Sequence, residues 1–121
     1  MAVQEPTFLI LTALAPQPLH GYGLMQRVKE LSESRVQLRT GTLYGALDRL
    51  MVEGLIAGDR EEVVDGRLRR YYRLTDDGAG VLATEAERLE RNVEAARAGL
   101  RQRAARPVRP GLTMTFVADP A

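Results

Sequence analysis

The strongest constraint on the fold is a helix pattern that is followed at once by a hairpin pattern. Between residues 39 and 55 (RTGTLYGALDRLMVEGL), leucines recur at steps of four and three and lay one apolar stripe along a helix: Leu43, Leu47 and Leu50. Gly54 suits the left-handed conformation that ends helices. The sequence therefore predicts a short helix with one buried side and one free side.

Polar residues occupy the free side of this helix. Thr40, Tyr44 and Asp48 lie off the apolar stripe, and either Thr40 or Thr42 can cap the helix by accepting a hydrogen bond from an unpaired backbone N–H. Small polar residues and a tyrosine at the N-terminal end suit a helix that enters a DNA major groove, where the first turn reaches base edges and phosphates. An ordinary amphipathic helix is the alternative, and the residues that follow decide between the two.

Two β-prone runs follow the helix, and the dipeptide Asp65-Gly66 joins them. Asp-Gly readily adopts the positive φ angles of tight turns between strands, so the pattern predicts a hairpin. Alternation along the second strand places a basic face opposite the one that carries Leu68, Arg70, Tyr72 and Leu74. This basic face is the stronger candidate for phosphate contacts and consists of Arg67, Arg69, Tyr71 and Arg73.

Two helices are expected ahead of this motif, which completes the pattern of a winged helix-turn-helix. The first, over residues 7–15 (TFLILTALA), is apolar nearly all round and needs partners on two sides. The winged-helix core supplies one partner and a second protomer can supply the other, while complete burial in a monomer is the alternative. The second helix opens at residues 19–23 and runs to about Leu31, with Leu24, Val28 and Leu31 on its buried face.

Four residues near these helices are candidates for contacts. Tyr22 suits packing and phosphate contact equally well. His20 is the only histidine, and without cysteine or clustered carboxylates beside it we expect a structural role rather than metal binding or catalysis. Arg35 and Arg39 flank the turn before the recognition helix, at residues 32–38, and both can reach the DNA backbone.

A second long pattern follows the hairpin. Thr75 is predicted to cap a fourth helix, and apolar residues along that helix follow steps of four and three: Leu82, Ala86, Leu89, Val93, Ala96 and Leu100. Such a seam favours dimerisation over folding back on the domain, because a single solvated helix would leave the seam wet. Two copies would place two recognition helices about one turn of DNA apart, or a multiple of that, and so bind an inverted repeat.

The predicted fold is mostly α with a small β-hairpin, in three parts. Residues 1–75 form the winged helix-turn-helix domain, residues 76–103 form the dimerisation helix, and residues 104–121 form a tail containing proline. Prolines in the tail prevent helix continuation, and a flexible segment is the simplest expectation. As an alternative, residues 112–117 (LTMTFV) alternate as a strand that docks on the partner protomer or on an effector site.

Four motifs, LHGYGL, GTLYGALDRL, EGLI and RRYYRLTDDG, occur in this order between Phe8 and Gly78. Together they resemble the PadR family of transcriptional regulators, in the shorter subfamily with one C-terminal dimerisation helix. The chain departs from the usual family pattern at Gly45, where proline is common, and at Gly23, where a larger residue is common. Glycine inside a helix costs about 0.5–1 kcal/mol relative to alanine, so both departures predict slightly looser helices.

The resemblance implies a homodimeric repressor that leaves an inverted-repeat operator in double-stranded DNA when a small aromatic or apolar effector binds. It implies DNA contacts from Tyr22, Thr40, Gly41, Thr42, Tyr44, Gly66 and Arg67, to which the charge pattern adds Arg39 and Arg69. The expected effector site between protomers is lined by Phe8, Leu11, Leu89, Asn92, Val93 and Ala96.

Composition limits the other classes of function. The 121 residues contain no cysteine, which excludes disulfides and thiolate metal sites, and no apolar run is long enough for a membrane span. No secretion signal, Gly-rich phosphate loop, nucleophile elbow or metal cluster is evident, so we expect a cytoplasmic protein without cofactor, metal or enzymatic activity. The net charge of only +1 supports one alternative, a winged helix that contacts proteins and has no specific operator.

Overall fold

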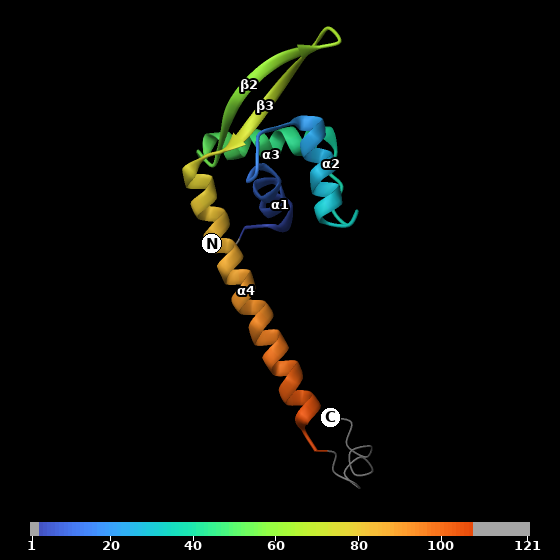
Figure 1. Cartoon of the computed structure of the whole chain (residues 1–121), viewed down its shortest axis with the longest axis vertical. Coiled ribbons are helices and arrows are strands. Elements are labelled where there is room, and N and C mark those ends of the chain that lie inside the picture. The colour runs from blue at the N-terminus through green and yellow to red at the C-terminus, as the bar shows by residue number, and fades with distance from the viewer. Residues whose placement is uncertain (1–2, 108–121) are drawn as a thin grey trace. The chain divides into compact units, whose positions relative to one another are not determined.

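The computed structural model describes residues 3–107 and contains five helical or hairpin segments plus one short strand (Figure 1). In chain order these are α1 (Glu5–Leu14), β1 (Leu19–His20), α2 (Gly21–Leu31), α3 (Thr40–Val52), β2 (Ile56–Val64), β3 (Arg67–Leu74) and α4 (Asp76–Ala105). The chain divides into two compact units, which meet within α4 between Arg88 and Leu89. The predicted class is confirmed: a mostly helical chain with a winged helix-turn-helix and a long C-terminal helix.

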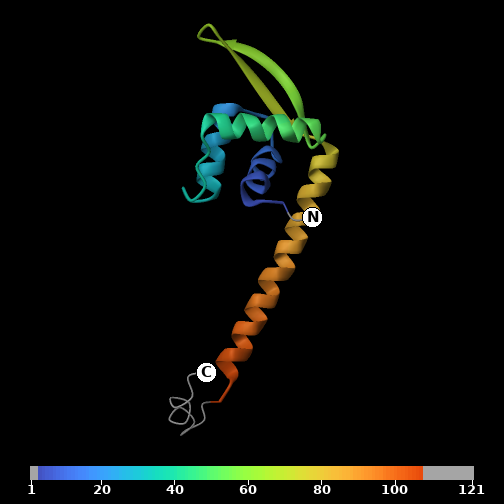
Figure 2. The same cartoon turned by 180° about the vertical axis from the view of Figure 1, so that it is seen from behind.

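The core of the first unit lies where α1, α2 and α3 meet the base of the sheet. The three leucines of the predicted stripe, Leu43, Leu47 and Leu50, are fully buried, which confirms the apolar face of α3. Five of the ten residues of α1 are buried as well, because its apolar residues extend nearly all round the helix. In both views the hairpin extends from one side of α3, while α1 and α2 lie on the other (Figures 1 and 2).

The hairpin forms as predicted. Asp65 and Gly66 have φ angles of 51° and 77°, the positive values that a tight turn between twisted strands requires. Val64 pairs with Arg67 beside the turn, and the register shifts once, between Gly58 and Glu61.

The short strand β1 was not predicted. Leu19 and His20 were assigned to the second helix, but they pair with Tyr72 and Tyr71 and add a third strand to the sheet, in the order β1-β3-β2. The pairing satisfies backbone groups along the open edge of β3. Two residues are too few to show a strand periodicity, so only the long-range pairing reveals this element.

The helix ends follow the predictions in part. Gly54 has a φ of 76°, as expected for the residue that ends α3. The predicted cap at the other end is wrong, because Arg39 is the N-cap, makes no side-chain capping bond, and leaves Thr40 as the first helical residue. The first helix begins at Glu5, two residues earlier than predicted, since proline is tolerated in a first turn.

The junction between α3 and α4 is tightly bonded. Thr75 caps α4 as predicted, with its Oγ1 accepting a hydrogen bond of 3.0 Å from the Gly78 backbone N–H. The same hydroxyl donates to the Gly54 carbonyl at 2.7 Å, and the Thr75 N–H donates to the Leu55 carbonyl at 3.1 Å. Gly78 packs directly against that carbonyl, and a Cβ atom at this position would overlap it.

The predicted seam of α4 has two different environments. In the first unit, Leu82 packs against the winged-helix core, so this residue contributes to the fold of its own domain. In the second unit, Val93 and Leu100 are 48% and 64% exposed. Among the described residues, no helix is both long enough and apolar enough to cross a membrane. The predicted strand at residues 112–117 and most of the predicted tail lie outside the described residues.

Candidate nucleic-acid interface

A groove lies between the N-terminal end of α2, the α3 helix and the outer half of the hairpin. Its volume is about 710 Å³, and it is lined by His20, Gly21, Tyr22, Tyr44, Val64, Asp65, Arg67, Leu68, Arg69 and Arg70. The groove thus brings together four of the predicted DNA contacts from three separate elements.

The predicted contacts all reach the surface. Tyr22 and Tyr44 are 66% and 42% exposed, which favours contact with a ligand over core packing for Tyr22. The first turn of α3 and the hairpin turn are exposed at Arg39, Thr40, Gly41, Thr42, Gly66 and Arg67, and Arg69 is half-buried. The exposed surface formed by the N-terminal ends of α2 and α3 and by the hairpin therefore presents small polar groups, two phenols and cationic side chains.

Gly21 sets the position of Tyr44. The Tyr44 hydroxyl lies against the Gly21 Cα, so closely that a Cβ atom there would overlap it. Tyr22, one residue further on, accepts a hydrogen bond of 2.9 Å from Gln26 Nε2. Sequence reasoning missed the role of Gly21, although its place between His20 and Tyr22 in the LHGYGL motif was a usable signal.

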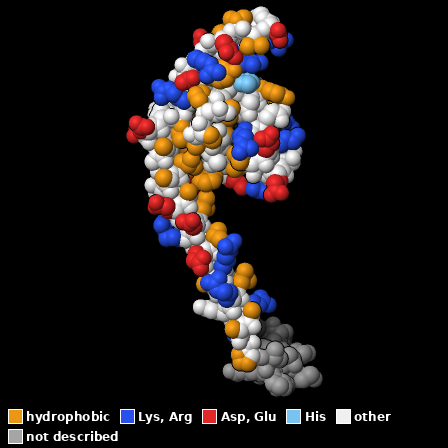
Figure 3. Space-filling model, viewed as in Figure 1, with side chains coloured by type: hydrophobic (Ala, Val, Ile, Leu, Met, Phe, Trp, Pro, Cys, Tyr) orange, Lys and Arg blue, Asp and Glu red, His pale blue; other side chains and the backbone are white. Residues whose placement is uncertain are grey.

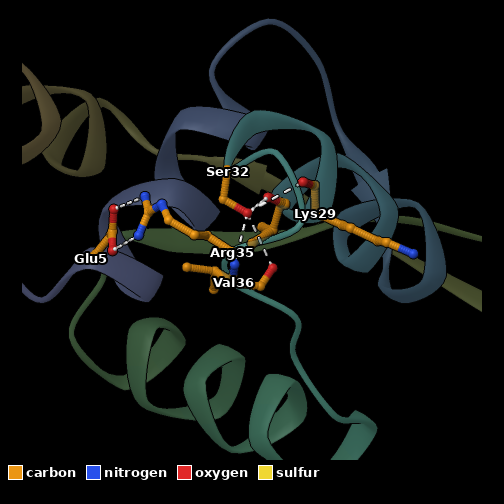
Figure 4. Close-up of polar contacts among 6 residues, drawn as sticks. Glu5, Lys29, Ser32, Arg35 and Val36 are labelled. Atoms are coloured by element: carbon orange, nitrogen blue, oxygen red, sulfur yellow. Dashed lines mark hydrogen bonds and ion pairs between the residues drawn. The ribbon is translucent and has the colours of Figure 1, made fainter.

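The turn before α3 is held by internal polar contacts (Figure 4). The buried Ser32 hydroxyl donates to the Val28 carbonyl at 2.9 Å and accepts from the Val36 N–H at 2.9 Å. Arg35 donates two hydrogen bonds to Glu5, at 2.9 and 2.5 Å, and this contact lowers the pKa of the Glu5 carboxyl. Arg35, which was expected to reach DNA, links the turn to α1.

Several wing arginines are also paired within the hairpin. Arg70 contacts Glu61 at 3.1 Å, Arg73 contacts Asp59 at 3.9 Å, and Arg60 lies over the Tyr71 ring with its guanidinium carbon 3.8 Å from the centroid. The Tyr71 hydroxyl donates to Glu62 at 2.6 Å. Half of the predicted basic face, Tyr71 and Arg73, is therefore engaged inside the wing.

The remaining arginines of this domain differ. Between residues 3 and 88, Arg39, Arg67 and Arg69 are the arginines without an ion pair to a described carboxylate. A cation without a carboxylate partner can neutralise a phosphate without first breaking an internal ion pair. The unpaired arginine charge of this domain is therefore concentrated at the N-terminal end of α3 and on the outer part of β3.

His20 has the structural setting that was expected. Its ring lies 5.3 Å from the Tyr71 ring, between centroids, and a Cβ atom on Gly23 would touch it. Burial lowers the pKa of His20, and the nearby Arg69 lowers it further. Within residues 3–107, no three side chains of the metal-binding types gather into a candidate site.

The predicted effector residues are divided between the two units. Phe8 and Leu11 belong to α1, where Leu11 is buried, and Leu11 also lines a cavity of about 430 Å³ with Thr7, Arg49 and Leu55. Leu89, Asn92, Val93 and Ala96 belong to the second unit, where Leu89 is half-buried and the others are exposed. A shared effector site stays a prediction.

Comparisons with known proteins agree with this geometry. The family model described as "Transcriptional regulator PadR-like family" matches residues 10–84. The transcriptional regulator Rv3488 of Mycobacterium tuberculosis is 41% identical over 81 residues, which cover 67% of this chain and 72% of that protein.

Two solved structures illustrate the structural similarity. A PadR family transcription regulator from Clostridium difficile is 26% identical, with a TM-score of 0.69 over 80% of this chain and 99% of that one. Bacillus subtilis PadR, solved in complex with operator DNA, is 26% identical with a TM-score of 0.60, over 67% of this chain and 46% of that one. The family model matches more than half of the chain's 121 residues, so the chain belongs to the PadR-like family of transcriptional regulators.

Proposed function

We propose that the protein is a sequence-specific DNA-binding regulator that acts in the cytoplasm as a homodimeric repressor. The observation that carries the proposal is the groove in which Tyr22, Tyr44, Arg67 and Arg69 converge, because Arg67 and Arg69 have no carboxylate partner among residues 3–107. The operator complex of the related Bacillus subtilis PadR supports DNA as the ligand. The low net charge does not oppose this, since the available arginines are concentrated in one region.

In this proposal the two elements bind different parts of the DNA. The first turn of α3, from Thr40 to Thr42, enters the major groove together with Tyr44, where short polar side chains reach base edges. The wing, through Gly66, Arg67 and Arg69, contacts the phosphate backbone and positions α3.

The exposed seam of α4 supports the proposed dimerisation. Val93 and Leu100 are one heptad apart, and apolar side chains so exposed on a long helix are stabilised by packing against a second copy. One winged helix covers only a few base pairs, so a symmetric pair would bind an inverted repeat. A small aromatic or apolar effector would act by favouring a dimer geometry whose half-site spacing does not fit the operator.

The test is a fluorescence anisotropy titration against the DNA upstream of the protein's own gene, with scrambled duplex as competitor, across a series of salt concentrations. We expect tight binding that scrambled DNA fails to displace, and a log-log slope of about −0.9 per phosphate neutralised. Binding no tighter than to scrambled DNA, there and across a genomic fragment library, would favour the alternative, a winged helix that contacts proteins.

A further inference from the structure

Two apolar side chains are exposed together near the end of the hairpin. Val63 and Leu68 are direct cross-strand partners in β2 and β3, one pair away from the turn, and are 70% and 59% exposed. Directly opposed residues of an antiparallel ladder point to the same face of the sheet. The two side chains therefore form one apolar patch, which we name the wing-tip pair.

The same face of the hairpin is buried at its base. Ile56 and Tyr72 both belong to the core, together with the three leucines of α3. This face of the hairpin thus stays apolar at Val63 and Leu68, which lie beyond the domain's core. Exposed apolar side chains on a hairpin favour unwanted association, so their presence outside the core indicates a surface that packs against a ligand.

The surroundings of the wing-tip pair indicate the chemistry of that ligand. Leu68 lines the same groove as Arg67 and Arg69, which alternation along β3 places on the other face of the hairpin. These are the two wing arginines without carboxylate partners among the described residues. Figure 3 shows hydrophobic, basic and acidic side chains close together at the far end of the hairpin. A matching ligand presents anionic groups beside an apolar wall. The DNA minor groove does so, because deoxyribose rings form its walls and phosphates form its edges.

We infer that Val63 and Leu68 pack against deoxyribose rings in the minor groove beside the site bound by α3. Arg67 and Arg69 hold the wing there by contacting the flanking phosphates. The inference rests on the proposed function and adds a contact that releases no counterions. The wing-tip pair therefore contributes affinity that does not depend on salt, while Arg67 contributes affinity that falls as salt rises.

The experiment compares the intact chain with the double variant Val63→Thr/Leu68→Thr, which places threonine, a residue that suits strands, at both positions. Val52→Thr is the control, because Val52 is more exposed than either residue and does not line the groove. Affinity for the operator duplex is measured across the salt series. The double variant should bind about tenfold more weakly, or about 1.4 kcal/mol, at every salt concentration and with an unchanged slope.

Chemical footprinting locates the contact. Hydroxyl radicals attack deoxyribose from the minor groove, and dimethyl sulfate modifies guanine N7 in the major groove. The double variant should lose protection from hydroxyl radicals at the wing positions and keep the guanine protection given by α3.

Three results would overturn the inference. Unchanged affinity and unchanged sugar protection in the double variant, with Arg67→Ala still weakening binding, would refute the wing-tip contact and leave the proposed function standing. A double variant that sediments as a monomer would assign the pair to a protein interface instead. Absence of any specific footprint by the intact chain would refute both the proposed function and the inference.

Discussion

Two surfaces of this molecule expose large apolar side chains, and they differ in the charges around them. At the wing tip, Val63 and Leu68 lie near Arg67 and Arg69, for which the described residues offer no carboxylate partner. In the second unit, Val93 and Leu100 lie on a helix that carries glutamate and arginine together, and Arg101 contacts Glu94 at 3.3 Å. Exposed apolar side chains do not by themselves identify a partner, so the neighbouring charges guide our two proposals: DNA for the first surface and a second copy of the chain for the other.

The largest effect is expected at the helix seam. Val93→Glu places a carboxylate in the apolar seam, so the protein should sediment as a monomer and bind its operator at least 100-fold more weakly, because only one half-site is then engaged at a time. Ala95→Glu adds the same charge at a nearby exposed position outside the seam and should leave both properties unchanged. A dimer that persists in Val93→Glu would mean that the seam of α4 is not the dimer interface.

At the wing, the matched pair is Arg67→Ala and Arg73→Ala. Arg67 has no carboxylate partner in the described part of the chain, whereas Arg73 contacts Asp59, so only the first substitution removes an available cation. Arg67→Ala should weaken operator binding about tenfold and reduce the magnitude of the salt slope by about one. Anisotropy titrations across the salt series measure both quantities. Equal losses in the two variants would mean that internal pairing does not determine which arginines bind phosphate.

Substitutions at two glycines test the position of Tyr44 in the groove and the stability of α3. In Gly21→Ala, the new methyl group displaces the Tyr44 hydroxyl, so operator affinity should fall about fivefold, or about 1 kcal/mol, while urea unfolding changes little. Gly45→Ala meets open space on an exposed face of α3 and should stabilise the protein by about 0.5–1 kcal/mol. Unchanged affinity in Gly21→Ala would mean that the position of Tyr44 does not matter for binding.

The smallest effect concerns pH. Because the pKa of His20 is lowered in the folded state, the unfolded chain takes up a proton more readily as pH falls below about 6.5. The free energy of unfolding should therefore decrease as pH falls through that range. His20→Gln should remove this part of the dependence in urea titrations at a series of pH values, and an identical profile in the variant would assign the effect to other groups.

Features that depend on nearby residues could be predicted from the sequence, and contacts between distant residues could not. The Leu43-Leu47-Leu50 stripe, the Asp65-Gly66 turn and the Thr75 cap depend on residues within a few positions of one another, and all three were predicted correctly. Strand β1 and the contact of Gly21 with Tyr44 join residues far apart in the chain, and both were missed.

The candidate site shows the same limit. Alternation placed Arg67, Arg69 and Arg73 on one basic face, but it could not distinguish Arg73, which contacts Asp59, because a sequence does not show which carboxylate a cation will meet. Likewise, the sequence did not show that Arg35 forms an ion pair with Glu5, thirty positions away, and its contact with DNA stays a prediction.

The joint between α3 and α4 has a mechanical consequence. Thr75 makes three hydrogen bonds there, and Gly78 leaves no room for sliding against the Leu55 carbonyl. The first turn of α4 cannot change its tilt unless Gly54 and Leu55 move with it or these bonds break. The joint is thus stiff, and torque on the start of α4 is delivered to the C-terminal end of α3. In our proposal, α3 is the helix that enters the DNA.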